Sequence, residues 1–243
     1  MKILHITTSY LPTMAGAEFV VKNLYEKQRS SGHDVKLLVP FTFYRLSDKK
    51  NIYSMPPYLG KLAFNFPKIA SYYSYIYLLL LRKFFKFDVV HCHFIYPTGL
   101  YVIKLLKKHK IKAIVTPHGV DIQKYNLDSN KINGINENIY IPEIQNISKS
   151  FNKIIALSND MENCLINTYS IDKNKIIKIP NGVECENFNL IKNSKKSSKK
   201  IILTVGRNHP KKGFDLIPLI IQYLLKNKID NFHWVLIGGG CSK

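Results

Sequence analysis

Short apolar runs alternate along the chain with segments whose apolar residues recur at helical spacing. Lys2–Thr7 is predicted as a buried strand, and apolar residues within 17–24 then recur three or four positions apart, as on one face of a helix. Gly32 stands where a glycine commonly ends a helix, and Val35–Val39 is predicted as a second strand. This alternation favours a parallel sheet covered by helices on both faces.

The same alternation predicts further elements as far as residue 190. Helices are predicted over Tyr72–Phe87, Gly99–His109 and 138–150. Strands are predicted over Asp88–His91, Ala113–Thr116, Ile154–Leu157 and Ile176–Ile179. Ser158 is predicted to cap a further helix, because Asp160 and Glu162 fall in the turn that follows it. Residues 41–70 and 121–137 are predicted as irregular connections.

A polar run rich in lysine and serine, residues 191–200, predicts a linker between two domains. The domain before it spans 1–190 and is expected to be an α/β, Rossmann-like parallel sheet. After the linker the pattern predicts one strand–helix–strand unit: Ile201–Val205, Phe214–Lys226 and Trp234–Ile237. A lone unit of this kind cannot bury a core of its own. We therefore expect 201–243 to be the truncated start of a second Rossmann-like domain.

The charge balance is strongly basic, with 36 Lys and Arg against 16 Asp and Glu and a net charge of +20. Such a surface favours polyanionic partners, whereas the alternative is a compositional bias in a chain also rich in Asn and Ile. No zinc finger, reading helix or RNA-binding signature accompanies the charge, so no nucleic-acid partner is predicted. The four cysteines lack metal-binding spacing, and we expect reduced thiols in a cytoplasmic protein.

Candidate chemistry lies in loops after predicted strands, where α/β proteins bind ligands. Gly16 offers close backbone approach and free N–H groups at a helix start, with a plain turn glycine as the alternative. His91 and His93 share one face by their period-two spacing. A metal site needs a third ligand, so one buried structural histidine and one loop histidine is the favoured interpretation. His118 follows a buried strand, and we expect its ring to face the cleft rather than to be a surface histidine.

Arg207 and Lys212 lie between a predicted strand and the start of a helix. A guanidinium, an ammonium and free helical N–H groups suit a diphosphate, whereas the alternative is two solvated loop cations. The sequence contains no Asp-x-Asp, the carboxylate pair that would hold a metal ion against a diphosphate. We therefore predict no metal site and no cofactor, and we expect cations to neutralise the diphosphate.

Taken together, these segments resemble family 4 of the retaining glycosyltransferases, which have the GT-B fold. Five matching segments follow one another along nearly the whole chain: Gly16–Glu18, Asp88–His93, Thr116–Gly119, Ile179–Glu184 and Val205–Gly213. The resemblance implies transfer of a hexose-type sugar from a nucleotide sugar, as substrate, to a cell-surface polysaccharide or lipid-linked glycan acceptor. The alternative is a non-catalytic or split-subunit module that binds acceptor, membrane or a partner chain.

The resemblance also implies residue roles. Gly16 would lie against the donor diphosphate, and His118 would contact the donor sugar near the reacting centre. Arg207 and Lys212 would stabilise the charge that develops on the leaving nucleoside diphosphate. Further residues of the cleft would be Glu18, His93, Asn181 and Glu184.

Two features depart from the family pattern or extend beyond it. The family's paired glutamates, Glu-x7-Glu, have no counterpart after Glu186, so we expect a complementing C-terminal half to supply them. The aromatic, leucine-rich segment Tyr72–Phe87 has Lys61, Lys68, Arg82, Lys83 and Lys86 around it. This composition predicts peripheral contact with an anionic membrane, at the inner face of the cell membrane, whereas the alternative is a helix buried on the sheet.

Overall fold

The computed structural model describes residues 1–10, 16–39, 50–55, 66–123, 130–132, 135–185, 199–206, 208 and 212–239. The chain divides into two compact units, Met1–Val183 and Glu184–Lys243. Residues 191–198 of the predicted linker lie outside the described residues, as do Arg207, Lys61 and the side chain of Lys68.

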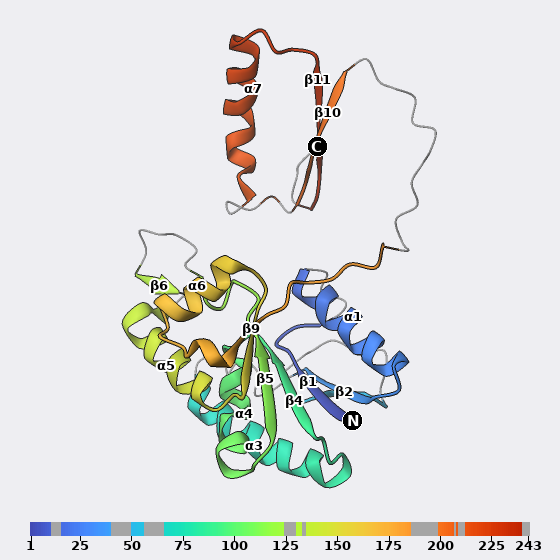
Figure 1. Cartoon of the computed structure of the whole chain (residues 1–243), viewed down its shortest axis with the longest axis vertical. Coiled ribbons are helices and arrows are strands. Elements are labelled where there is room, and N and C mark those ends of the chain that lie inside the picture. Colours follow the sequence, from blue (N-terminus) through green and yellow to red (C-terminus); the bar gives the residue numbers. More distant parts are fainter. Residues whose placement is uncertain are drawn as a thin grey trace. The chain divides into compact units, whose positions relative to one another are not determined.

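The first unit is built on a parallel sheet of seven strands, as the sequence predicts (Figure 1). In spatial order these are β3 (Ile52–Ser54), β2 (Asp34–Val39), β1 (Lys2–Ile6), β4 (Val89–His93), β5 (Lys112–Thr116), β8 (Lys153–Ala156) and β9 (Ile176–Lys178). The predicted strands recur with ends shifted by one or two residues. The edge strand β3 is the exception, because it lies within 41–70, which the sequence predicts as irregular.

The strand order reverses direction between β1 and β4. The chain runs outward from β1 to β2 and β3, and then returns to place β4 on the other side of β1. In open α/β sheets, ligands bind at the carboxyl ends of the strands where the order reverses. The register of β1 and β4 sets His5 opposite His91 at this point.

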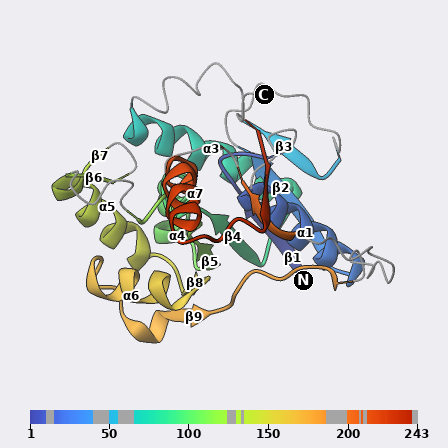
Figure 2. The ribbon, with the colours of Figure 1, turned by 90° about the horizontal axis from the view of Figure 1, so that it is seen from above.

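Two separate apolar clusters cover the two faces of the sheet. Figures 1 and 2 show the helices that surround it. One cluster joins Leu4 and Ile6 to the following helices: α3 (Pro67–Phe84), α4 (Thr98–Lys108), α5 (Glu137–Lys149) and α6 (Asn159–Asn167). The other packs Val21 of α1 (Gly16–Ser30) against Ile3 and its neighbours. Because side chains alternate along a strand, His5 shares the α1 face with Ile3.

Helix boundaries follow local signals in the sequence. The Ser158 hydroxyl accepts a hydrogen bond from the Met161 N–H at 3.1 Å, which confirms the predicted cap of α6. The region predicted as an irregular connection contains a short hairpin of β6 (Lys131–Ile132) and β7 (Ile135–Asn136). Among the described residues, no helix combines the length and the apolar character that crossing a bilayer requires.

The second unit pairs two parallel strands, β10 (Lys200–Val205) and β11 (Phe232–Ile237), through α7 (Ile217–Lys226). The helix expected over Phe214–Lys226 begins with a 3-10 turn, η5 (Phe214–Leu216). Most apolar side chains described in this unit face solvent; Leu216 and Ile220, for example, are 51% and 43% exposed. Two strands and one helix therefore leave apolar surface open on this unit.

Candidate active site

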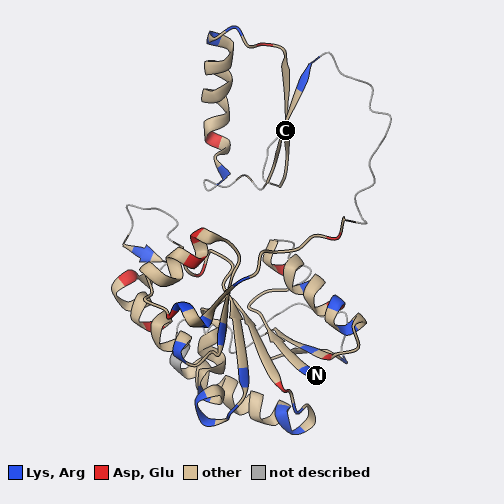
Figure 3. Cartoon of the chain, viewed as in Figure 1, with Lys and Arg blue, Asp and Glu red and all other residues tan. Residues whose placement is uncertain are grey.

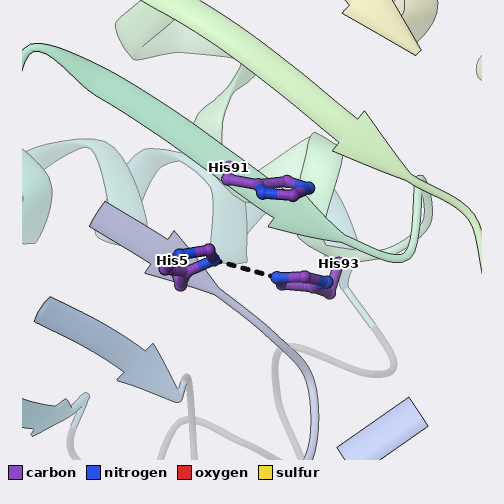
Figure 4. A group of neighbouring side chains, drawn as sticks. All are labelled: His5, His91 and His93. Carbon is purple, nitrogen blue, oxygen red and sulfur yellow. Dashed lines mark hydrogen bonds between the residues drawn. The ribbon is translucent and has the colours of Figure 1, made fainter. Parts of the chain in front are cut away.

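Three histidines meet at the carboxyl ends of β1 and β4, on the face of the sheet that α1 covers (Figure 4). His5, His91 and His93 are buried. The His5 Nδ1 and His93 Nε2 atoms are 2.9 Å apart, and the rings of His91 and His93 stack with centroids 4.4 Å apart. The interpretation of His93 as a loop histidine is wrong, because β4 extends through His93 and both of its histidines are buried.

His118 extends this group from the end of the neighbouring strand β5. Its Nε2 atom lies 3.3 Å from the His93 Nδ1 atom, and its ring packs 4.8 Å from the ring of Phe94, measured between centroids. Gly119 follows with a φ of +92°, a backbone conformation that glycine adopts at little cost. The turn at Gly119 follows the end of β5, and His118 lies half-buried beside His93.

Asp121 fixes the loop that carries His118. One carboxyl oxygen accepts the His118 N–H at 2.9 Å, and the other accepts the Ile95 N–H at 2.6 Å. Burial raises the pKa of Asp121 to about 6, although these N–H groups act in the opposite direction. The Tyr140 hydroxyl donates to the Asp121 carbonyl at 2.7 Å. The loop is thus held by the Asp121 carboxyl and by the Tyr140 hydroxyl.

The four histidines are neutral at physiological pH because burial opposes their charged form. Burial lowers the pKa of His5 from 6.5 to about 4, and the pKa of His118 likewise to about 4. Burial also holds the pKa of His91 and of His93 well below the usual value. A neutral imidazole offers one N–H donor and one nitrogen acceptor, so these histidines can contribute hydrogen bonds but no charge.

The start of α1 lies beside this group. Glu18 is buried in the first turn, where its Oε1 atom accepts a hydrogen bond from the Ser9 hydroxyl at 2.5 Å. Its Oε2 atom is buried and has no hydrogen-bond partner among the described residues. The negative charge of Glu18 raises the pKa of His118 and so opposes the larger effect of burial. At Gly16 no described atom lies within 4 Å of the place a Cβ would take, so the backbone there is open.

The geometry of the histidines favours hydrogen bonding over metal binding. His5, His91 and His93 offer nitrogen atoms within 4.8 Å of one another, as a shared metal ion would require. However, His91 and His93 stack with only 27° between their planes, and imidazole lone pairs lie in the ring plane. Both nitrogens of His5 are already paired, with Gln28 and with His93. We therefore interpret His5, His93 and His118 as a hydrogen-bonded chain of imidazoles, on which His91 stacks.

The other candidate residues lie elsewhere in the chain. Asn181 is exposed after β9, and Glu184 is exposed at the start of the second unit. Lys212 is exposed in the second unit, where its stem packs beside Gly206 after β10. Among the candidates that the structure describes, Glu18, His93 and His118 lie together.

Sequence reasoning missed His5, Gln28, Thr116 and Asp121 as parts of this site. The signal for His5 was its position in an otherwise apolar buried strand, in register with His91. Thr116, at the end of β5, lies 2.8 Å from the His91 Nε2 atom through its hydroxyl. Gln28 gave no local signal, because only the packing of α1 on the sheet brings it to His5.

Comparison with known proteins identifies the family. The chain matches Glycosyltransferase Family 4 over residues 14–187. It is 26% identical over 255 residues to the UDP-Gal:alpha-D-GlcNAc-diphosphoundecaprenol alpha-1,3-galactosyltransferase of Escherichia coli, covering 99% of this chain and 62% of that protein. It is 24% identical over 246 residues to the phosphatidylinositol N-acetylglucosaminyltransferase GPI3 subunit of Saccharomyces cerevisiae, covering 95% of this chain and 51% of that protein.

The fold comparison agrees with the sequence comparison. The solved structure of TarM superposes with a TM-score of 0.70 at 12% identity, covering 100% of this chain and 72% of that chain. At this identity the likeness concerns the fold alone. The chain spans between about half and two thirds of the length of the curated relatives it matches.

Proposed function

The chain belongs to glycosyltransferase family 4, and we propose that it carries the acceptor-side domain and the start of the donor-side domain of a sugar transferase. In this proposal a hexose-type sugar moves from a nucleotide sugar to a cell-surface polysaccharide or a lipid-linked glycan. The names of the Escherichia coli and yeast relatives both contain a lipid, diphosphoundecaprenol in one and phosphatidylinositol in the other. These names support the lipid-linked class of acceptor.

The observation that carries this proposal is a neutral, half-buried His118 that follows β5 and lies beside His93 of β4, the strand at which the strand order reverses. A neutral imidazole is suited to a hydrogen bond with a sugar hydroxyl. It carries no positive charge that would bind the diphosphate instead. His118 is therefore assigned to the donor sugar. The open backbone at Gly16 and the N-terminus of α1 are assigned to the diphosphate, since free helical N–H groups favour an anion.

Transfer forms a bond between an acceptor oxygen and the anomeric carbon of the sugar. The bond from that carbon to the diphosphate breaks, and the nucleoside diphosphate leaves with the electron pair. The acceptor hydroxyl loses its proton, which the leaving diphosphate can take up. Arg207 and Lys212 are assigned to the negative charge on the leaving group, in place of a metal ion held by carboxylates.

Calorimetry with two ligands tests this assignment. A nucleoside diphosphate should bind the purified chain, and Lys212→Ala should weaken that binding by about tenfold, more at low salt. His118→Ala should leave diphosphate binding unchanged but should weaken binding of the matching nucleotide sugar by several-fold, because only the sugar contact is lost. Equal losses for both ligands in His118→Ala would remove His118 from the sugar site.

An exposed apolar stripe on α3 supports the membrane part of the proposal. Its residues recur three or four positions apart and are all more than half exposed: Phe66, Ile69, Tyr72, Ile76, Leu80 and Phe84. The opposite side of α3, including Leu78, packs on the sheet, so the helix is buried on one side and open on the other. The interpretation of α3 as a helix buried on the sheet therefore holds for one side, and the exposed side is available for the proposed membrane contact.

Basic residues flank this stripe (Figure 3). Arg82 and Lys83 occupy the last turn of α3, and Lys104 of α4 stacks its ammonium over the Tyr72 ring. Apolar residues beside cations suit the interface of an anionic lipid surface. We therefore assign the stripe to peripheral contact with the inner face of the cell membrane, where a lipid-linked acceptor would be presented.

A non-catalytic or split-subunit module remains the second candidate function. The yeast relative is named as a subunit, which supports this class. A partner chain would then provide the complementing C-terminal half. Co-purification of such a partner, with transfer only when both chains are present, would favour this candidate over a single-chain enzyme.

A further inference from the structure

A continuous chain of hydrogen bonds runs from α1 across two strands to His118. The Gln28 Oε1 atom lies 2.7 Å from the His5 Nε2 atom. The His5 Nδ1 atom lies 2.9 Å from the His93 Nε2 atom, and the His93 Nδ1 atom lies 3.3 Å from the His118 Nε2 atom. In the rings of His5 and His93, one nitrogen bonds to the preceding side chain and the other nitrogen bonds to the next one.

Because the rings are neutral, all hydrogen bonds in this series are donated in the same direction. A neutral imidazole has one N–H donor and one acceptor nitrogen, and the amide oxygen of Gln28 can only accept. The His5 Nε2 atom must therefore carry the proton, which leaves the His5 Nδ1 atom as an acceptor. The same reasoning then places a proton on Nε2 of His93 and on Nε2 of His118.

We propose that Gln28, His5 and His93 are positioning residues that hold His118 in the tautomer protonated on Nε2, so that its Nδ1 atom accepts a hydrogen bond from a ligand hydroxyl. The inference that the hydroxyl belongs to a donor sugar rests on the proposed function. His118 Nδ1 makes no hydrogen bond to the described residues, whereas its Nε2 is occupied by His93. The site is thereby set to receive a hydroxyl donor.

The wild-type protein itself provides the first test. Long-range proton–nitrogen NMR of the full chain labelled with 15N-histidine distinguishes protonated from unprotonated ring nitrogens, without any ligand. We expect His5, His93 and His118 to share one tautomer, protonated on Nε2. A spectrum in which the three rings adopt different tautomers would contradict the proposed hydrogen-bond chain, because two donors or two acceptors would then face each other.

Two substitutions at Gln28 provide a sharper test with opposite expectations. Gln28→Glu keeps an acceptor and should leave all three rings protonated on Nε2. Gln28→Lys presents a donor to His5 and should reverse the chain, so that His118 becomes protonated on Nδ1. Asn23→Lys, at an exposed position on the same helix, is the control for added charge and should change no tautomer. An identical His118 tautomer in Gln28→Glu and Gln28→Lys would overturn the proposal.

Ligand binding then separates this inference from the proposed function. With the chain reversed in Gln28→Lys, a nucleotide sugar should bind about 3- to 10-fold more weakly, whereas the nucleoside diphosphate should bind as in wild type. If the His118 tautomer reverses but both ligands bind as in wild type, the hydrogen-bond chain is confirmed and the assignment of His118 to the donor sugar is wrong. Addition of Zn²⁺ should leave the spectra of His5, His91 and His93 unchanged, and a metal-induced shift of all three would instead identify a metal site.

Discussion

At the scale of single residues, the candidate site depends on burial that no sequence pattern displays. His118 and His93 were recognisable because they follow or end predicted strands. Asp121 and Gln28 were not, because their roles arise from contacts between residues distant in sequence: Asp121 accepts the Ile95 N–H across the loop, and Gln28 pairs with His5. A candidate list drawn from strand ends therefore contains His93 and His118 and omits the side chains that hold them.

The Tyr140 hydroxyl, which holds the His118 loop, provides a test at this scale. Tyr140 is buried and donates to the Asp121 carbonyl at 2.7 Å. Tyr140→Phe removes that donor and leaves a buried carbonyl without it, so we expect the free energy of unfolding to fall by about 1–2 kcal/mol. Urea denaturation measures this change, with Tyr223→Phe as the control because Tyr223 is exposed. Equal denaturation midpoints for the two variants would show that the loop does not depend on Tyr140.

At the scale of elements, short apolar runs and helical spacing predicted most of the strands and helices of both units. The prediction failed at β3, a three-residue edge strand too short to display an apolar run. It was incomplete at α3, because the same residues read as a buried helix or as a membrane-facing one. The contacts show which side of α3 is buried and which is exposed, and a one-dimensional pattern cannot show this.

The exposed stripe of α3 gives the prediction at this scale. Ile76→Glu places a negative charge in the centre of the stripe and should weaken binding to vesicles rich in anionic lipid by about tenfold, through lost apolar contact and charge repulsion. Ile139→Glu on α5 is the matched control, because Ile139 is also exposed. Co-sedimentation that is insensitive to anionic lipid, or equally reduced in both variants, would place the contact elsewhere.

At the scale of the whole molecule, the buried histidines link folding to pH. His5 and His118 have pKa values lowered from 6.5 to about 4 by burial, and burial also holds the pKa values of His91 and His93 well below the usual value. Between pH 6.5 and 4 the unfolded chain therefore binds more protons at these residues than the folded chain does. Asp121 acts in the opposite direction, because its pKa rises from 3.8 to about 6 on folding.

Acidification should consequently destabilise the first unit. Each of His5 and His118 lowers the free energy of unfolding by roughly 3 kcal/mol once the pH is below its pKa in the folded state. The opposite effect of the Asp121 carboxyl is smaller than the combined effect of the four histidines. We expect the midpoint of thermal unfolding to fall steadily from pH 7 to pH 5 at constant salt. An unchanged or rising midpoint over this range would mean that the histidines are not buried in neutral form.

The central claim, that this chain serves nucleotide-sugar transfer, is tested most directly by a donor panel. Nucleotide sugars that vary in base and sugar are incubated with a lipid-linked acceptor and the 243-residue chain, alone or joined to the donor-side remainder of a family relative. We predict transfer from at least one donor by the joined protein, and binding of the nucleoside diphosphate with far less turnover by the chain alone, since positioning of the sugar contributes up to about 7–11 kcal/mol of barrier lowering. Failure of both proteins to bind any nucleoside diphosphate or to transfer any sugar would contradict the claim.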